Sequence, residues 1–467
     1  MKMQISESHP AHLLQLGAAR CAQAVATGLV TAEALCEAAI DSIESSDHIV
    51  NAVVVRDFER AREQARAADQ RWRRGERAPL LGVPMTVKES FNVAGLPTSW
   101  GLPPFSEFRP DADAVAVQRL KAAGAVILGK TNIPSVLADW QSTNPVYGRT
   151  THPLDAKRTP GGSSGGGAAA LAAGFVALEF GSDLLGSIRI PAHFCGVWGH
   201  KSSAGILPMR GHAFPGMPEP VGPAPDLSAV IGPLGRSAED LRLALLAVAG
   251  PEAPMSEAWE LRLPLPRQAD PARWEVLVLD EHPLATMADD MRATLDEAAR
   301  RLARSGARIT RQAALPQGLL PDLALLHQTH ISHIEILSTA FKPGAECTMN
   351  AHEWIHLTAR RAGLRAQSLA LMQRFDAVLC PSFGVAAFEH LDEPDWTLRT
   401  LDIDGRSTPY HAQGAWSSLA SLAGLPATQV PVGKNAAGLP LGVQLVGGWL
   451  QDLGTLEIAR HLAPDPA

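Results

Sequence analysis

The spacing of apolar residues along the chain changes repeatedly between a helical period and a strand period. Residues 9–47 carry apolar side chains at helical spacing, and Thr31 is placed to cap a second helix within this segment. A strand is predicted over 51–56, a charged, arginine-rich helix over 58–74, and a short apolar strand over 79–90. Helices that alternate with short strands in this way predict an α/β protein.

The same alternation continues towards the C-terminus. Helices are predicted over 112–124, 237–249, 288–305 and 416–422, and strands over 125–130, 274–279, 307–310, 375–381, 427–432 and 438–446. The segment 316–372 is helix-rich and contains many histidines. Because there is no internal repeat and no low-complexity linker, we expect one domain over 1–467, with a core at about 10–250 and 375–465 and a helical cap at about 250–375.

The stretch 158–201 combines two glycine-rich turns with serines. The first turn carries Ser163 and Ser164, and an alanine-rich run that can begin a helix follows it. An apolar run over 175–180, suited to a buried strand, leads to the second turn, which ends on Ser187. Glycine turns let backbone amides approach a ligand closely and point at developing negative charge. Two such turns, each with a hydroxyl, indicate acyl-transfer chemistry.

Composition narrows the classes of protein that fit. The apolar content of 46% and charged content of 19% are ordinary for a globular protein. A net charge of −7 without a long basic run argues against a nucleic-acid-binding surface. The cysteines lack CxxC spacing, the N-terminus lacks a signal-peptide core, and no apolar run reaches the ~20 residues of a membrane span. We expect a cytoplasmic monomer or homodimer with no membrane or nucleic-acid partner.

Lys88 ends the apolar run PLLGVPMTVK. Periodicity alone favours a lysine that reaches the surface at the end of a strand. The alternative is a buried lysine whose pKa is lowered by desolvation, so that it can act as a base. The sequence around Ser163 also fits the G-x-S-x-G nucleophile elbow, but that elbow follows a strand. The preceding residues 155–160 are polar and end in proline, which disfavours the elbow.

A literal H-E-x-x-H motif stands at His352, Glu353 and His356. On a helix the two histidines share a face and can bind zinc, with the glutamate as base and Glu389 or Glu393 as a third ligand. The pentapeptide is short, lies in a histidine-rich region and lacks the metzincin extension. A zinc hydrolase is therefore a remote alternative, and we expect no metal and no cofactor.

Taken together, these segments resemble the amidase signature family. The stretch GGSSGGGAAALAAGFVALEFGSDLLGSIRIPAHFCGVWGHK is similar to the signature itself, PLLGVPMTVKES to the family's lysine strand, and GKTNIPSVLADWQSTNPVYGRT to its next block. FDAVLCP and the segments LAGLPATQVPVG and GLPLGVQLVG resemble the C-terminal pattern. The resemblance covers roughly residues 10–465 and is faintest over 250–350. It implies an α/β/α sandwich around a large central mixed β-sheet with a helix-rich cap region.

The resemblance also implies a Ser–cisSer–Lys triad. Ser187 would be the nucleophile, Ser163, beside a cis peptide bond, the relay, and Lys88 the base. Ser187 follows Ser163 by 24 positions and Lys88 precedes it by 75, a spacing that makes Ser163 rather than Ser164 the relay. A neutral lysine can take the proton of a serine through an intervening hydroxyl, and the relay can return that proton to the leaving amine.

The second turn would supply the oxyanion hole, from the backbone amides of Leu184, Leu185, Gly186 and Ser187. Asp183, Arg189 and Ser164 would support this turn. Family members usually have glycine where this chain has Leu185. If that position needs a positive φ, leucine there costs about 1 kcal/mol or more; otherwise its side chain lines the acyl pocket. We expect Leu185→Gly to change substrate range more than stability. Gly167, where serine is common, is a smaller departure with little expected effect.

The predicted substrate pocket is apolar, with few fixed charges. Its expected lining comprises Trp140, Met209, Phe214 and Met217, with residues around 320–360. We expect hydrolysis of the C–N bond of small apolar or aromatic amides, with esters and carbamates as further substrates. The blocks DWQSTNPVYGRT and RGHAFPGMP resemble broad-specificity bacterial amidases, which include urethanases. The alternative is the amidase subunit of a tRNA-dependent amidotransferase.

Overall fold

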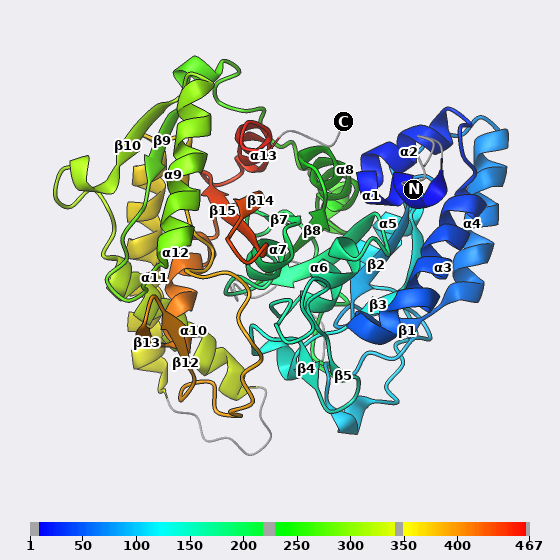
Figure 1. Cartoon of the computed structure of the whole chain (residues 1–467), viewed down its shortest axis with the longest axis horizontal. Helices are drawn as coiled ribbons and strands as arrows, with labels where there is room; N and C mark the ends of the chain where they lie inside the picture. The colour runs from blue at the N-terminus through cyan, green and yellow to red at the C-terminus, as the bar shows by residue number, and fades with distance from the viewer. Residues whose placement is uncertain (1–8, 218–228, 341–348, 464–467) are drawn as a thin grey trace.

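One mixed sheet crosses the molecule in this computed structural model, which describes residues 9–217, 229–340 and 349–463. Among these residues eleven strands form the sheet, from β1 on the right of Figure 1 to β10 on the left. In order across the sheet they are β1 (Val53–Arg56), β3 (Val126–Thr131), β2 (Pro84–Lys88), β6 (Leu178–Asp183), β8 (Val230–Gly235), β7 (Trp198–Lys201), β14 (Ala427–Lys434), β15 (Pro440–Val446), β11 (Ala377–Cys380), β9 (Glu275–Val278) and β10 (Arg308–Arg311). Strands β3, β2 and β6 run parallel, as do β11, β9 and β10, and the other neighbours are antiparallel, so the predicted mixed α/β sheet is confirmed.

Helices pack along the whole length of this sheet. They are α1 (Pro10–Leu16), α2 (Ala18–Ala26), α3 (Ala32–Val50), α4 (Phe58–Arg73), α5 (Val115–Ala122), α6 (Gly165–Ala172), α7 (Arg189–Cys195), α8 (Ala238–Val248), α9 (Asp289–Arg304), α10 (Leu323–Ala340), α11 (Ala351–Met372), α12 (Ala415–Ala423) and α13 (Asp452–Arg460). Helices α6 and α7 contact each other at the centre of the molecule (Figure 1). Over the described ranges, none of the helices has the length and apolarity to cross a membrane.

Two short hairpins lie outside the main sheet. They are β4 (Thr143–Asn144) with β5 (Gly148–Arg149), and β12 (Thr400–Ile403) with β13 (Arg406–Pro409). Neither hairpin is predicted by the sequence pattern, since each strand is only two to four residues long.

Helix α6 begins with three glycines at the point where the chain comes closest to the sheet. A Cβ atom on Gly166 would lie 2.7 Å from the backbone oxygen of Asn132, and one on Gly167 would lie 2.6 Å from the carboxyl carbon of Glu179. Real side chains do not tolerate such separations, so glycine is required by the close approach. The loop before α6, which carries Ser163, is therefore fixed against the sheet.

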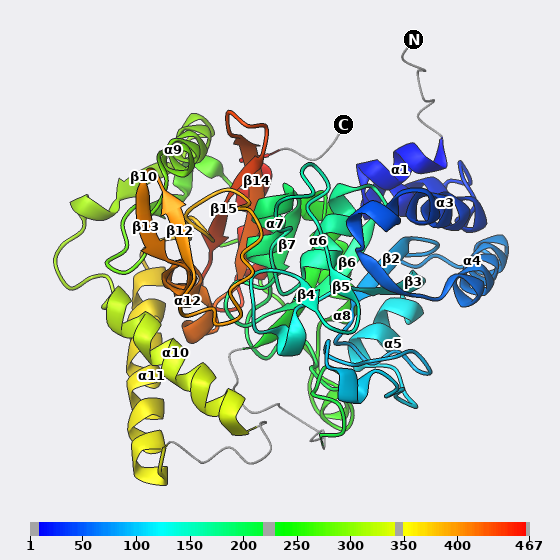
Figure 2. The same cartoon turned by 60° about the horizontal axis from the view of Figure 1, so that its bottom comes forward.

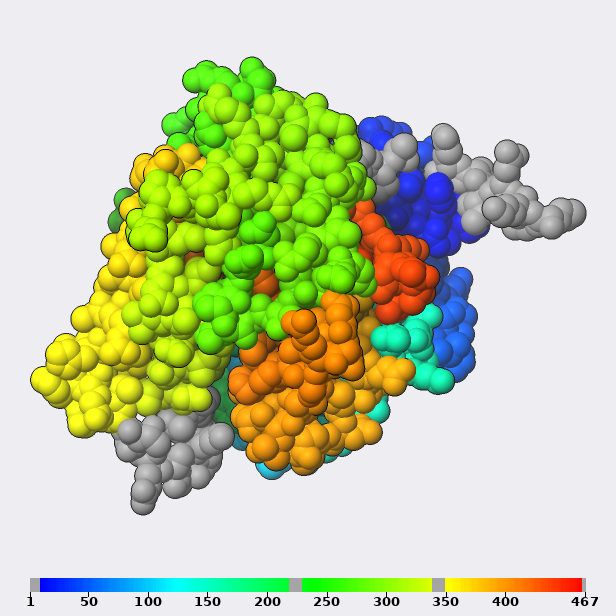
Figure 3. Space-filling view, turned by 60° about the vertical axis from the view of Figure 1, so that its left-hand side comes forward, coloured from blue at the N-terminus to red at the C-terminus, as the bar shows by residue number. Residues whose placement is uncertain are grey.

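The segment 250–375, predicted as a cap, is not separate from the sheet. Its strands β9 and β10 pair in parallel beside β11 and extend the sheet at one edge. Its helices α10 and α11 contact each other and α12, and they project from the molecule at the lower left of Figure 2. Figure 3 brings the left-hand side of Figure 1 forward. In that view the green-to-yellow segment covers much of the surface beside the orange region that includes the β12–β13 hairpin.

Two central strands, β7 and β8, are missed by the sequence pattern, and β6 begins three residues after the predicted start of its strand. Strand β8 contains Pro233, which pairs opposite Phe180 of β6 although proline is rare in inner strands. Strand β7 has the sequence WGHK, with two long polar side chains that are nevertheless buried. Pairing with neighbours on both sides overrides the weak local preference of these residues.

Candidate active site

Lys88 lies at the end of β2 with no exposed surface. Its Nζ atom is 2.7 Å from Ser163 Oγ, 3.0 Å from Ser182 Oγ and 3.4 Å from the Ser182 carbonyl oxygen. A neutral amine has two N–H bonds and one lone pair, which matches donation to Ser182 and acceptance from the Ser163 hydroxyl. Burial lowers the pKa of Lys88 to about 7, against the raising effect of the Asp183 and Glu179 charges. The surface lysine favoured by periodicity is therefore wrong.

The peptide bond between Gly162 and Ser163 is cis, as the family resemblance implies. Ser163 is buried, and the backbone N–H of the next residue, Ser164, donates to the carbonyl oxygen of Ser187 at 3.1 Å. The Ser164 hydroxyl donates to the carbonyl oxygen of Ser182 at 3.3 Å. These bonds join the loop of the predicted relay to the turn of the predicted nucleophile, so all three residues of the predicted triad belong to one neighbourhood.

Asp183 organises the second turn from within. Its Oδ1 atom accepts the N–H of Gly186 at 2.8 Å, and its Oδ2 atom accepts the N–H of Ile188 at 3.0 Å. Gly186 has a φ of +89°, which glycine adopts without strain. Because the Gly186 N–H already has a carboxylate acceptor, the predicted set of four oxyanion donors narrows to the amides of Leu184, Leu185 and Ser187.

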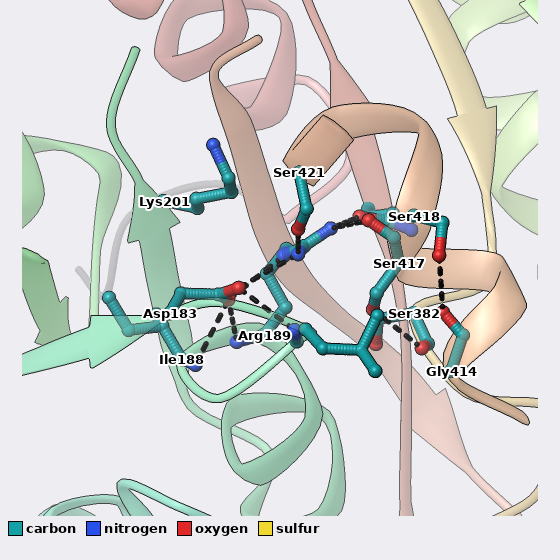
Figure 4. Close-up of polar contacts among 12 residues, drawn as sticks. Asp183, Ile188, Arg189, Lys201, Ser382, Gly414, Ser417, Ser418 and Ser421 are labelled. Atoms are coloured by element: carbon teal, nitrogen blue, oxygen red, sulfur yellow. Dashed lines mark hydrogen bonds and ion pairs between the residues drawn. The ribbon is translucent and has the colours of Figure 1, made fainter. Parts of the chain in front are cut away.

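Arg189 connects this turn to α12 and β15 (Figure 4). Its Nε and Nη2 atoms donate to the two carboxylate oxygens of Asp183 at 3.0 and 2.8 Å. Nη2 also donates to Ser421 Oγ, and Nη1 donates to the Ser417 carbonyl oxygen and to Gln444 Oε1. All five guanidinium N–H groups are thereby used within the protein, so none is left for a substrate. Burial would raise the pKa of Asp183, but the Arg189 charge holds it well below its usual range.

An aromatic cluster lies next to the Lys88 strand. His212 Nε2 is 2.9 Å from the hydroxyl oxygen of Ser90, two residues beyond Lys88. The His212 ring contacts Trp100 at 5.5 Å between centroids, and Trp100 contacts Phe214 at 5.8 Å. Burial, and then the Lys88 charge, lower the pKa of His212 to about 3, so this ring is neutral at physiological pH. The cluster carries no charge and adjoins the Lys88 strand through His212.

The other predicted pocket residues differ in how far they are buried. Trp140 is buried, its Nε1 atom donates to the Leu185 carbonyl oxygen at 2.9 Å, and its ring lies 5.5 Å from that of Phe383. Met209 packs half-buried against the core, whereas Met217 is 41% exposed. Trp140 thus supports the turn that carries Leu185, and Met217 lies at the surface. Residues 218–228, which follow Met217, are outside the described residues.

The H-E-x-x-H segment forms the first turn of α11. Asn350 caps the helix, and the carboxylate of Glu353 accepts the Asn350 backbone N–H at 2.9 Å in a capping box. His352 and His356 are exposed, with 3.0 Å between their Nε2 atoms. Within the described parts of the chain, no three histidine, cysteine or carboxylate side chains converge as metal ligands. The glutamate therefore serves the helix terminus, and neither Glu389 nor Glu393 supplies a third ligand to the two histidines.

Comparisons with known proteins show the family to which the chain belongs. The profile of the Amidase family matches residues 34–326 and 329–456. The chain is 34% identical over 459 residues to AtzE, a 1-carboxybiuret hydrolase subunit from Pseudomonas sp. (strain ADP), covering 92% of this chain and 94% of that protein. The chain belongs to the amidase signature family. It is accordingly a hydrolase that acts on C–N bonds.

Other amidase signature proteins are similar over nearly the whole chain. Fatty-acid amide hydrolase 2-A of Danio rerio is 32% identical over 486 residues, which cover 96% of this chain and 88% of that protein. A solved structure of a vestigial protein complex, described for the origins of an s-triazine catabolic enzyme, superposes with a TM-score of 0.81 at 29% identity, covering 96% of this chain and 98% of the other. A crystal structure of an amidase gives a TM-score of 0.76 at 27% identity, over 96% and 99%.

Leu185 departs from the amidase signature pattern without backbone strain. It is not among the non-glycine residues with positive φ. Its Cδ2 atom is 3.0 Å from the position that a Cβ on Gly414 would occupy, and the Trp140 ring adjoins the same position. The side chain therefore fills space between its own turn and the start of α12.

Replacement of Leu185 by glycine is expected to change kcat/KM between short and branched acyl substrates by about 10-fold, because it removes a side chain beside the reacting turn. The loss of stability should be only about 1 kcal/mol, since Leu185 is half-buried. Hydrolysis rates across an acyl-chain series, with melting temperatures, measure both effects. Unchanged selectivity with a lower melting temperature would contradict this role.

At Gly167, where the sequence analysis expects little effect, the structure places the Glu179 side chain close to the backbone. Because a Cβ there would lie 2.6 Å from the Glu179 carboxyl group, Gly167→Ser is expected to destabilise the protein by about 1–3 kcal/mol. Urea unfolding measures this effect. The matched control is Gly363→Ser in α11, where a Cβ would meet nothing within 4 Å and stability should not fall. Equal stability of the two variants would show that the Glu179 side chain moves aside freely.

Three residues of the site escape the sequence analysis: Ser182, Glu179 and His212. Ser182 precedes Asp183 at the end of β6, and only the fold shows that its hydroxyl reaches Lys88. Glu179 could have been noticed in the sequence, because a lone carboxylate within an apolar strand is unusual. His212 lies 124 positions after Lys88 in a loop without periodicity, so the sequence holds no signal for it.

Proposed function

We propose that this hydrolase cleaves small apolar or aromatic amides through an acyl-enzyme on Ser187, with Ser163 as relay and Lys88 as base. The observation that carries the proposal is the 2.7 Å contact between Lys88 Nζ and Ser163 Oγ, made by a lysine whose pKa burial lowers to about 7. A substantial fraction of this amine is unprotonated at neutral pH and can accept a proton.

In the proposed reaction, the Ser187 oxygen attacks the substrate carbonyl carbon as its proton passes to Ser163 Oγ. The Ser163 proton passes in turn to Lys88 Nζ, which becomes an ammonium. Backbone amides of Leu184, Leu185 and Ser187 stabilise the oxyanion. The same path in reverse protonates the leaving nitrogen, the C–N bond breaks, and water then hydrolyses the ester on Ser187.

Two features support an uncharged substrate. His212, which adjoins the Lys88 strand and contacts Trp100, is neutral because burial lowers its pKa to about 3. Arg189, the buried cation nearest the reacting turn in sequence, donates every N–H to protein acceptors. Neither group presents a charge to a carboxylate. Esters and carbamates share the acyl carbon and are expected as further substrates.

A hydrolysis panel tests this proposal. Wild type and Ser187→Ala are compared on p-nitroanilides, p-nitrophenyl esters and aryl carbamates with aliphatic, aromatic and carboxylate-bearing acyl groups. We expect wild type to prefer apolar or aromatic acyl groups and Ser187→Ala to be inactive on all of them. Activity retained by Ser187→Ala, or a preference for charged acyl groups, would contradict the proposal.

A second candidate function is that of the amidase component of an amidotransferase. It is favoured by the similarity to the A subunit of the Glutamyl-tRNA(Gln) amidotransferase of Roseiflexus castenholzii, which is 30% identical over 488 residues covering 96% of this chain and 95% of that protein. Such a component would release ammonia from glutamine. Glutaminase activity in excess of anilide hydrolysis would favour this function, and hydrolysis of anilides without glutaminase activity would exclude it.

A further inference from the structure

A second buried ionisable group lies on the same face of the sheet as Lys88. Glu179, on β6, has no exposed surface and pairs in register with Thr86 of β2. Because alternate residues of a strand share a face, Thr86 and Lys88 project to the same side. Thr131 of β3, which pairs with Lys88 in the parallel register, projects to that side too.

The Glu179 carboxyl group is held between these neighbours. Thr86 Oγ1 donates to Glu179 Oε2 at 2.5 Å, and Thr131 Oγ1 donates to Glu179 Oε1 at 2.8 Å. Gly167 of α6 covers the group from above and leaves space for it because it lacks a Cβ. The side chain is fully buried, so its charge acts on Lys88 through a low-dielectric interior.

We propose that Glu179 is a positioning residue that titrates together with Lys88, so that its ionisation sets the pH range over which Lys88 is a free amine. The inference rests on the proposed role of Lys88 as the base. Burial raises the pKa of Glu179 to about 8, against the opposing effects of Thr86, Thr131 and Lys88. Burial lowers the pKa of Lys88 to about 7. The two groups therefore exchange protons in the same pH range and behave as a coupled pair.

The sign of the coupling follows from the charges. As pH rises, Lys88 loses its positive charge while Glu179 gains a negative one. The new carboxylate attracts the remaining proton on Lys88, which delays and broadens the loss of that proton. Replacement of Glu179 by glutamine removes the carboxylate and keeps the hydrogen-bonding shape. In the variant, Lys88 should lose its proton at a lower pH and over a narrower range.

The other charged groups near Lys88 do not account for this coupling. The Asp183 charge raises the pKa of Lys88 more than that of Glu179 does. Because its buried partner Arg189 holds the pKa of Asp183 well below its usual range, Asp183 stays ionised throughout this pH range and does not titrate with Lys88. His212 is neutral, because its pKa is lowered to about 3. Lys130, whose pKa is lowered to about 8, precedes Thr131 on β3 and so projects to the opposite face of the sheet, where it donates to Thr98 Oγ1. Lys201 of β7 acts on Asp183 and donates to the Leu425 carbonyl oxygen.

The test is the pH dependence of Ser187 labelling by a fluorophosphonate, which needs no knowledge of the natural substrate. For wild type, the second-order labelling rate is expected to rise with pH to a midpoint near that of Lys88. For Glu179→Gln, the midpoint should move down, by less than about one pH unit because Glu179 is only partly ionised there, and the transition should sharpen. A midpoint that stays in place or moves upward would overturn the inference, even if the maximal rate falls.

Two further variants separate this role from a purely structural one. Thr131→Val removes one hydrogen bond to the carboxylate and keeps the side-chain volume. It should raise the proton affinity of Glu179 and move the midpoint in the same direction, by a smaller amount. If Glu179→Gln does not fold, the Thr131→Val midpoint decides. Absence of Ser187 labelling in wild type would contradict the proposed function instead, so the two failures are distinguishable.

Discussion

Replacement of Lys88 by methionine is expected to lower kcat/KM by about 10⁴-fold at neutral pH, because the proton of Ser187 then has no acceptor beyond Ser163. Methionine is unbranched and fits the same buried space, so the loss of activity reflects the missing proton acceptor more than a change in folding. Steady-state hydrolysis of the best anilide or ester of the panel measures it.

The matched control is Lys130→Met. Lys130 lies one strand away on β3, is equally buried, and also has a pKa lowered by burial, to about 8. Its Nζ atom donates to Thr98 Oγ1, whereas Lys88 Nζ lies 2.7 Å from Ser163 Oγ. We expect Lys130→Met to retain activity within about 10-fold of wild type. The substitution removes a hydrogen bond near the site but leaves the proposed proton acceptor, Lys88, in place. Full activity of Lys88→Met at neutral pH would show that another group is the base.

Replacement of Arg189 by methionine is expected to lower the free energy of unfolding by about 4 kcal/mol, because it leaves the buried Asp183 carboxylate without its partner. The same change removes the three bonds that join the turn to Ser417, Ser421 and Gln444. Urea unfolding measures the loss of stability. Activity should fall as well, since the turn carries the Ser187 hydroxyl.

Two comparisons isolate the cause of this loss. Arg242→Met removes an exposed pair with Glu239 on α8, which should cost no more than about 0.5 kcal/mol. The double variant Asp183→Asn/Arg189→Met removes the unpaired charge and should recover part of the stability lost in Arg189→Met. If the double variant is less stable than Arg189→Met, the turn depends on the Asp183 carboxylate itself more than on the pair.

The sequence supports the fold class because local patterns and the observed sheet agree over most strands. Helices that alternate with apolar strands predict an α/β protein, and the mixed sheet of the structure has that character. The exceptions, β7 and β8, carry glycine, proline and long polar residues in the middle of the sheet. Only pairing with strands distant in sequence makes them extended, and a local pattern holds no information on such pairing.

The residues of the candidate site also differ in whether the sequence alone could predict them. Lys88 and Ser163 follow from the resemblance to the amidase signature family, and their side chains lie 2.7 Å apart in the structure. Periodicity alone gives Lys88 the wrong environment, because the end of a strand is buried here by α6 and its loop. Glu179 and His212 reach the site from a neighbouring strand and a distant loop. Contacts of that kind exist only once the sheet has formed.

The most direct measurement of the central claim is a rapid-mixing experiment with an apolar p-nitrophenyl ester, read by absorbance and by the mass of the digested protein. We predict a burst of about one equivalent of p-nitrophenol per protein, and an acyl mass on the peptide that contains Ser187. Steady turnover with no burst and no acyl mass, or with the acyl group on Ser163 or Ser164, would contradict the account.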